Sequence, residues 1–449
     1  MFPLYPGGHF GLSWLDGACR WGDARGQNHV PEGFEMVRSG WVSWWVGLAL
    51  GCGSSTPSEP APVEPEAPAA KAVEGPQPVL FMVQAQFLPT NKPGPAKGVF
   101  YRKDGDFWTS DVLEDPDSNV WHKAMFWRDG ILTIGAQRAL LKHWTKQGDK
   151  WEAKTLYEAT FGGTYDRFRD VEIGDVDGDG QDEIVLATHD AGVVAVGDEQ
   201  VDGKWVFQQF DKTPDTFVHE VEIGDVDGDG KNEFYVTPSE RNKANGASQP
   251  GGVFRYDHQP DGTYARRPVV QYDKTHAKEI LVTDLDADGT DELYVVKEGV
   301  TTVSPTKMTL EEPVAIERFV AGEGQALVGT VIGELPGEAQ CRFLVAGDVN
   351  HDGKAELVAA SKGTGLWLLE SGPDAFTTTK IAENTGGFEH ATHLADLDND
   401  GKLEIYAASE MRRHRLLRRY VFDGERYVPT VIAPIPERHI TWNLADGTL

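Results

Sequence analysis

The chain has 449 residues, of which 40% are hydrophobic and 25% charged, so most of it can fold around a core. It contains 42 Lys and Arg residues against 71 Asp and Glu residues, which gives a net charge of −29. A field of that sign repels phosphate groups, which argues against nucleic acid as a partner. Fifty glycines and 10% aromatic residues are typical of short strands joined by tight turns.

An export signal is predicted over residues 36–51. Met36-Val-Arg is a short cationic start, and the apolar stretch from Trp41 to Leu50 is too short to cross a bilayer, which takes roughly 20 helical residues. Leu48-Ala-Leu-Gly-Cys52 resembles a bacterial lipobox. The resemblance implies that cleavage leaves Cys52 as a lipidated amino terminus. The alternative interpretation of this stretch is a buried strand.

The remaining boundaries follow from that signal. Because a signal is amino-terminal, residues 1–35 are predicted to be over-extended translation. Residues 52–78 are rich in Pro, Ala and Glu and are predicted to form a semi-extended tether. Residues 79–449 form the folded domain, in which Cys341 has no cysteine partner. Gly53 replaces the Asp that resembles an inner-membrane retention signal, so the expected location is the outer membrane, facing the periplasm or the surface.

One nine-residue pattern, D-x-D-x-D-G-x-x-E, occurs five times, with Asn at position 3 of the fourth copy. Oxygens at positions 1, 3 and 5 converge on a hard cation, Gly at position 6 permits the turn, position 7 offers its carbonyl, and the Glu at position 9 closes the cage. Oxygen ligands without His or Cys favour calcium. The predicted calcium ligands are Asp175, Asp177, Asp179, Gln181 and Glu183; Asp225, Asp227, Asp229, Lys231 and Glu233; Asp284, Asp286, Asp288, Thr290 and Glu292; Asp348, Asn350, Asp352, Lys354 and Glu356; and Asp396, Asp398, Asp400, Lys402 and Glu404.

An EF-hand begins in the same way but carries a bidentate Glu at position 12. Position 12 is apolar in all five copies and lies within a strand-like run, as at Leu186 in Ile184-Val-Leu-Ala-Thr188. The loops are therefore expected to join strands rather than helices. A single copy would be equally well explained as a solvated Asp/Gly turn, but five copies in register favour metal binding.

A strand, this acidic loop and an apolar strand, repeated every 50 to 60 residues or so over about 170–424, resembles the FG-GAP/VCBS repeat family. The resemblance implies an all-β propeller whose blades bind calcium. Residues 122–160 contain strand-like runs and a short turn, which predicts a blade without a metal loop. Residues 439–446 resemble the inner strand of the fifth repeat, so a blade closed by 79–118 plus 439–449 would leave no open edge. Seven blades are predicted, with six or eight as alternatives.

The residue six places before each first aspartate is predicted to start the innermost strand, at the channel mouth opposite the loops. These residues and their counterparts in the other two blades are Lys123, Arg169, His219, Lys278, Arg342, His390 and His439. One interpretation is that strand starts are simply polar. The functional interpretation is a cationic mouth for an anionic ligand, such as an acidic glycan or a carboxylate on a partner protein.

Motifs of nucleophilic, zinc or phosphate-binding enzymes are missing from the sequence. The predicted function is therefore a monomeric, calcium-binding, membrane-anchored propeller that binds a protein or glycan ligand, rather than an enzyme. The alternative is a polysaccharide lyase or another glycan-active enzyme that uses the channel mouth, since some lyases of acidic polysaccharides have propellers of similar repeats.

Overall fold

The computed structural model describes residues 76–162, 166–189, 191–243, 245–372, 375–411 and 414–449. The predicted signal, residues 1–35, most of the tether and Cys52 lie outside these residues. Within them, all named strands pair antiparallel, and the helical content is one 3₁₀ turn, Glu323–Gln325. No helix in this part of the chain has the length and apolarity that a membrane span requires.

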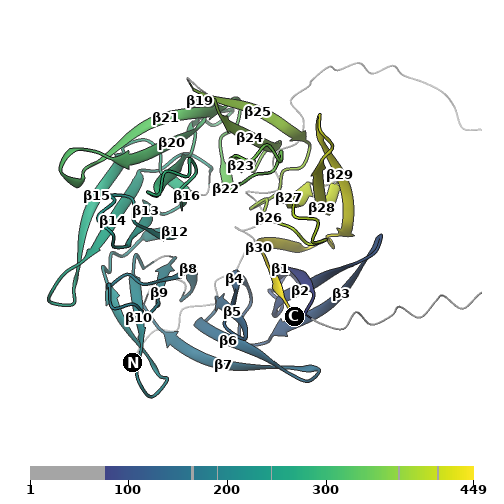
Figure 1. Cartoon of the computed structure of the whole chain (residues 1–449), viewed down its shortest axis with the longest axis horizontal. Helices are drawn as coiled ribbons and strands as arrows, with labels where there is room; N and C mark the ends of the chain where they lie inside the picture. The colour runs from purple at the N-terminus through teal and green to yellow at the C-terminus, as the bar shows by residue number, and fades with distance from the viewer. Residues whose placement is uncertain (1–75, 163–165, 190, 244, 373–374, 412–413) are drawn as a thin grey trace, which may run out of the picture. The chain divides into compact units, whose positions relative to one another are not determined.

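Seven four-stranded sheets surround a central axis, which confirms the predicted all-β fold and the number of blades (Figure 1). Six blades have their first strand innermost, and five of these are built from four consecutive strands. Blade 1 contains β4 (Trp121–Trp127), β5 (Gly130–Gly135), β6 (Ala139–Gln147) and β7 (Lys150–Ala159). Blade 2 contains β8 (Phe168–Gly174), β9 (Glu183–Thr188), β10 (Val194–Glu199) and β11 (Trp205–Phe210). Blade 3 contains β12 (Thr216–Gly224), β13 (Glu233–Glu240), β14 (Gly251–His258) and β15 (Tyr264–Tyr272).

Blade 4 contains β16 (Ala277–Thr283), β17 (Glu292–Lys297), β20 (Val314–Ala321) and β21 (Leu327–Leu335), and its middle connection carries the added hairpin of β18 (Val300–Val303) and β19 (Met308–Glu312). Blade 5 contains β22 (Cys341–Gly347), β23 (Glu356–Ser361), β24 (Gly365–Ser371) and β25 (Phe376–Glu383). Blade 6 contains β26 (Thr392–Ala395), β27 (Glu404–Met411), β28 (His414–Phe422) and β29 (Tyr427–Pro434).

The seventh sheet, here called the closing blade, combines both ends of the propeller. Its innermost strand is β30 (His439–Thr448), followed outward by β1 (Pro78–Gln86), β2 (Ala96–Asp104) and β3 (Phe107–Asp115). β30 and β1 are antiparallel, with Val79 opposite Gly447, and the Gln77 amide donates to the Leu449 carbonyl at 3.1 Å. The ring is therefore closed by backbone hydrogen bonds between segments at opposite ends of the domain.

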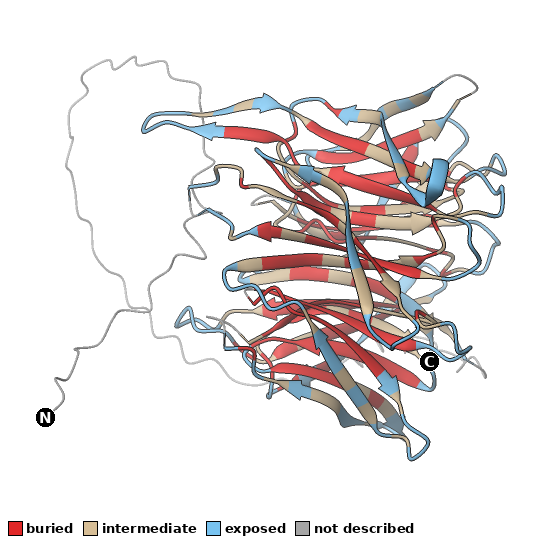
Figure 2. Cartoon of the chain, turned by 90° about the vertical axis from the view of Figure 1, so that its left-hand side faces the viewer, coloured by how far each residue is buried: buried red, intermediate tan, exposed pale blue. Residues whose placement is uncertain are grey.

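The middle strands are apolar on both faces because each blade packs between two others. In β9, Ile184 and Leu186 belong to a cluster with blade 1, whereas Val185 and Ala187 belong to a cluster with blade 3. Each of the seven blade–blade contacts has a cluster of this kind. This two-sided burial explains the continuous apolar runs in the sequence. Figure 2 shows buried strand centres with exposed turns at both ends.

A β-bulge near the start of the innermost strand occurs in six blades. The pairing register slips by one residue there, for example between Phe168 and Asp170 in β8. The same slip lies in β4, β12, β16, β22 and between β1 and β30. A bulge leaves an extra residue unpaired and turns its side chain away from the regular alternation. Consecutive residues of one strand can thereby face the channel together.

Gly447 tests how tightly the closing blade is packed against blade 1. A Cβ at this position would lie 2.2, 2.4 and 2.7 Å from ring carbons of Phe126 in β4. We expect Gly447→Ala to lower the free energy of unfolding by about 1–3 kcal/mol, since the ring and strand must shift. Urea unfolding measures this change, and the exposed neighbour Thr448→Ala is the control. Equal midpoints for the two variants would contradict close packing at this contact.

Candidate metal centres and central channel

The five acidic loops join the innermost strand to the second strand in blades 2 to 6. In each loop the first aspartate follows the end of the innermost strand, and the glutamate at position 9 begins the second strand. The loops are β8–β9, β12–β13, β16–β17, β22–β23 and β26–β27. In blade 1 the same connection is only Arg128-Asp129, which agrees with a blade that lacks a metal loop.

The backbone of each loop is held by its own aspartates. Position 6 has a left-handed conformation in all five loops, with φ between 82° and 94°, which glycine adopts without strain. Its amide donates to the carboxylate at position 1, as Gly180 does to Asp175 at 3.0 Å. The amide at position 7 donates to the side chain at position 5, as Gln181 does to Asp179 at 2.8 Å. These bonds fix the loop in a conformation in which the other carboxylate oxygens point toward one another.

Each loop brings carboxylate oxygens close enough together to hold one metal ion. The atoms of each group lie within 4.8 Å of one another. The groups are Asp175, Asp177 and Glu183; Asp225, Asp227, Asp229 and Glu233; Asp284, Asp286 and Glu292; Asp348, Asp352 and Glu356; and Asp396, Asp398, Asp400 and Glu404. The donor set is that of a hard cation, so the residues present fit a divalent metal.

Two predicted carboxylate ligands stand apart from these groups. Asp179 and Asp288 are not among the converging oxygens, and each accepts from the amide two residues later. Asn350, the one amide at position 3, donates through its nitrogen to Glu356 at 3.0 Å and to Glu370 of β24 at 3.3 Å, and its oxygen accepts from the Asp352 amide at 2.9 Å. The carbonyl role predicted for position 7 (Gln181, Lys231, Thr290, Lys354 and Lys402) remains a prediction.

Arginines from the third strand reach three of the loops, and the sequence analysis missed them. Each arginine contacts the carboxylates at positions 3 and 9, as Arg255 does at 2.5 Å from Asp227 and 3.3 Å from Glu233. A tyrosine two residues after the glutamate donates to it in the same three blades. The other two arginine sets are Arg318 with Asp286 and Glu292, and Arg419 with Asp398 and Glu404.

Blades 2 and 5 differ because no arginine reaches their loops in the described residues, and valine (Val185, Val358) replaces the tyrosine. Burial, with the neighbouring aspartates, raises the pKa of Glu183 to about 7. Burial also raises the pKa of Glu356 to about 7. These two loops therefore concentrate negative charge without a protein cation to offset it.

The predicted channel residues lie at the other end of the innermost strands. Six residues of extended strand, about 20 Å, separate each of them from the first aspartate of its loop. Arg169, Lys278 and Arg342 occupy the bulges of β8, β16 and β22, His219 shares the bulge of β12 with Glu220, and His390 precedes β26. All five are buried.

In two blades the residue at the bulge is not the one that the sequence analysis named, although Lys123 lines the channel cavity as predicted. In blade 1, His122 takes the bulge and Lys123 follows it, because the turn after β4 is shorter than a metal loop. In the closing blade, Trp442 takes the bulge, and His439 lies three residues earlier, half-buried at the start of β30.

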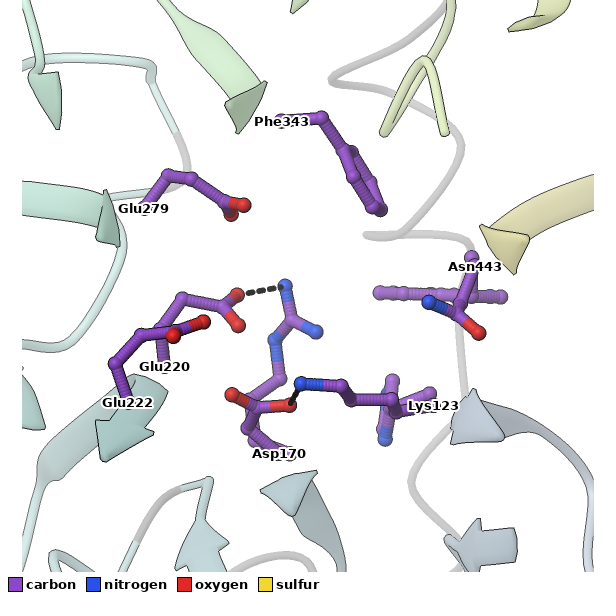
Figure 3. A pocket seen from close by; sticks show the side chains of 10 residues that line it. Lys123, Asp170, Glu220, Glu222, Glu279, Phe343 and Asn443 are labelled. Carbon is purple, nitrogen blue, oxygen red and sulfur yellow. Dashed lines mark ion pairs between the residues drawn. The ribbon is translucent and has the colours of Figure 1, made fainter. Parts of the chain in front are cut away.

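A cavity lies along the axis beside these bulges (Figure 3). Its volume is about 380 Å³ when the space that opens to solvent is included. Carboxylates line it together with the cations, so the channel is not purely cationic. Lys123 lies 3.0 Å from Asp170, and Arg169 lies 3.5 Å from Glu220. Burial, followed by repulsion from Asp170, raises the pKa of Glu220 well above its ordinary value. The other lining residues are His122, Glu222, Glu279, Phe343, Trp442 and Asn443.

The FG-GAP-like repeat family matches residues 175–236 and 348–407, which contain four of the five acidic loops. The chain carries FG-GAP-like repeats. The loop at Asp284 lies between the matched regions and has the same pattern. No curated protein matches the chain.

Several solved structures are similar to the propeller at low sequence identity. A protein from Lactobacillus plantarum has 12% identity and a TM-score of 0.54, covering 84% of this chain and 100% of that one. A Bacteroides uniformis protein to which 6-phosphogluconolactonase activity is ascribed has 14% identity and a TM-score of 0.50, covering 83% and 99%. The periplasmic gluconolactonase of Pseudomonas aeruginosa has 14% identity and a TM-score of 0.48, covering 82% and 99%. At these identities the first two likenesses show the fold alone.

The arginine contacts predict how the loops behave without metal. The side chains of Arg419 and Glu404 are 13% and 1% exposed, so Arg419→Gln would leave a buried carboxylate without its cation. We expect a loss of about 3–5 kcal/mol in the free energy of unfolding, measured with urea in the presence of a chelator. Arg426→Gln, in the same blade with a side chain 81% exposed, is the control and should change stability by no more than about 0.5 kcal/mol. Similar losses for both variants would contradict this role of Arg419.

Proposed function

We propose that the protein is a calcium-binding, membrane-anchored β-propeller that binds a ligand at the cell surface or in the periplasm. The calcium assignment rests on one observation: a cluster of three or four carboxylates recurs at equivalent positions in five loops. An incidental acidic turn would have no reason to keep the same register in five blades.

Calcium is the metal that suits this donor set best. Its ligands are oxygens in a flexible arrangement, whereas magnesium demands a tighter octahedron and gives up its water reluctantly. The five loops contain 21 Asp and Glu residues, and three arginines offset only part of that charge. An ion bound to a loop would link the end of the innermost strand to the start of the second strand. It would thereby stabilise the folded blade, since the unfolded chain does not hold the oxygens together.

Calcium removal is therefore expected to lower the melting temperature strongly, because each site contributes about 2.7 kcal/mol at 100-fold saturation. Differential scanning calorimetry with and without a chelator measures the shift, and magnesium should restore little of it. Asp177→Asn should reduce the calcium-dependent increment by roughly one site's share. Asp149→Asn, in an exposed turn of blade 1, should leave the increment unchanged. Identical melting of the chelated and calcium-loaded protein would contradict the calcium assignment.

Membrane anchoring rests on the lipobox-like segment that ends at Cys52 and on the Pro-, Ala- and Glu-rich residues that follow it. Residues 52–75 would connect that anchor to β1, whose first residue Pro78 pairs with Thr448 at the end of β30. This end of β30 corresponds to the end of the innermost strand at which the other blades carry their acidic loops. The tether would thus join the propeller on the side opposite the bulges.

Lipidation has a direct test. Cys52→Ser should give an unprocessed precursor or a product that no longer partitions with membranes, because the thiol is the atom that would carry the lipid. Fractionation and the mass of the mature amino terminus measure both outcomes. Cys341→Ser, at a thiol buried inside the propeller, is the matched control and should still be processed. Unchanged processing and membrane partitioning of Cys52→Ser would remove the anchor from the proposal.

A further inference from the structure

Three cations from blades 2, 4 and 5 lie at the bulge end of the channel. Arg169, Lys278 and Arg342 are 8%, 4% and 8% exposed, and they come from the bulges of β8, β16 and β22. After burial itself, Arg342 and Arg169 are the strongest influences that hold the pKa of Lys278 well below its ordinary value.

Lys278 has no carboxylate within ion-pair distance among the described residues. Its ammonium instead lies 2.8 Å from Nδ1 of His219, whose Nε2 lies 2.9 Å from the Ser239 hydroxyl. The ring of His276 lies 5.4 Å from that of His219, measured between centroids. Burial and the neighbouring cations hold the pKa of both histidines well below the ordinary value. Both imidazoles are thus neutral, and neither repels an anion.

Arg342 is the least satisfied member of this cluster. It has no hydrogen bond or ion pair with any described residue, and its Nε is buried without a partner. Nδ1 of His276, which is 5% exposed, is also buried without a partner. A buried charge without a hydrogen-bonded counter-charge costs several kcal/mol, so such a group is normally paired.

The nearest acids do not supply that pair. Glu389 lies 3.7 Å from Arg169, and Arg342, although beyond ion-pair distance, is the strongest of the charges that lower the pKa of Glu389. Glu298 accepts from the Cys341 amide at 3.3 Å, and burial raises the pKa of Glu298. The guanidinium groups of Arg169 and Arg342 therefore share the carboxylate of Glu389, and the cluster keeps an excess of positive charge even without a proton on Lys278, although the whole chain has a net charge of −29.

We propose that Arg342, Lys278 and His276, with Arg169 beside them, form a binding site for the oxyanion of a ligand in the channel. A guanidinium fork, an ammonium and an imidazole nitrogen suit a carboxylate or a sulfate-like group. Arg169 belongs both to this cluster and to the lining of the axial cavity, so the rest of the ligand would lie along the cavity. This inference rests on the ligand-binding role proposed above, and it names the charged group that the ligand carries.

Trp442 provides a wall beside the same site. Its ring lies 5.6 Å from the Arg169 guanidinium and contacts His122 edge-on at 4.5 Å. An indole face next to an oxyanion site favours a ligand that joins an acidic group to a ring, as a sugar acid does. Sulfate and glucuronate are therefore the probes that separate the two contributions.

The experiment is calorimetric titration of the calcium-loaded protein with sodium sulfate, sodium glucuronate, sodium acetate and glucose, at ionic strength matched with sodium chloride. We expect saturable binding of both oxyanions, tighter binding of glucuronate than of acetate, and no binding of glucose. Equal heats for sulfate and chloride in the wild-type protein would overturn the proposal without any variant. Equal affinities for glucuronate and acetate would overturn the contribution of the Trp442 wall.

Arg342→Gln and Lys278→Gln should each weaken sulfate binding by about 10-fold or more, since each removes a charged hydrogen-bond donor. Lys150→Gln, at an exposed position of β7, is the charge-matched control and should bind as the wild type does. The calcium-dependent rise in melting temperature should persist in Arg342→Gln, and sulfate binding should persist in Asp177→Asn. Sulfate binding without any calcium-dependent rise in melting temperature would contradict the proposed metal sites but not the anion site. Wild-type sulfate affinity in Arg342→Gln would contradict the anion site but not the metal sites.

Discussion

In each blade the second strand directs successive side chains to the preceding and to the following blade, so every sheet has two apolar faces to bury. A blade on its own would leave both faces in water, and a row of blades would leave one at each end. A closed ring buries both apolar faces of all seven sheets, provided that the contact between the first and last blades forms. The alternation of Ile184, Val185 and Leu186 between two clusters is the local form of this constraint.

The innermost strands carry different chemistry at their two ends. Where each strand ends, an acidic loop turns outward into the second strand, and its carboxylates gather on the side of the blade that lies against solvent. Where each strand begins, a bulge directs extra side chains to the axis, and charges of both signs meet there. The separation matters because carboxylates and guanidinium groups that lie in contact neutralise each other. Arg255, Arg318 and Arg419 illustrate that neutralisation on a small scale.

The fold was predictable because its signals are local. Each acidic loop is nine consecutive residues, and the glycine at position 6 is required by a conformation that the structure shows at Gly180 and Gly401. The channel was less predictable, since a bulge shifts the alternation of a strand without leaving a mark in the sequence. Counting back six residues from Asp129 reached Lys123 instead of His122, because Arg128 and not Asp129 directly follows the end of β4. The sequence analysis did not identify the arginines that contact the loops. Each lies in the third strand of its blade, where nothing in the sequence distinguishes it from any other charged strand residue.

The order of strands in the closing blade has a consequence for how the ring assembles. Among the strands that the structure describes, β30 comes last in the chain, yet it is the innermost strand of its sheet and pairs with β1, which comes first. As the chain emerges, β1 must wait with one edge unpaired until every blade between has been made. A vacant edge of this kind can recruit other strands. Chaperones that shield nascent chains would be needed longest at β1. A mutation that disrupts only β30 would leave β1 without its partner, although β1 is synthesised long before β30.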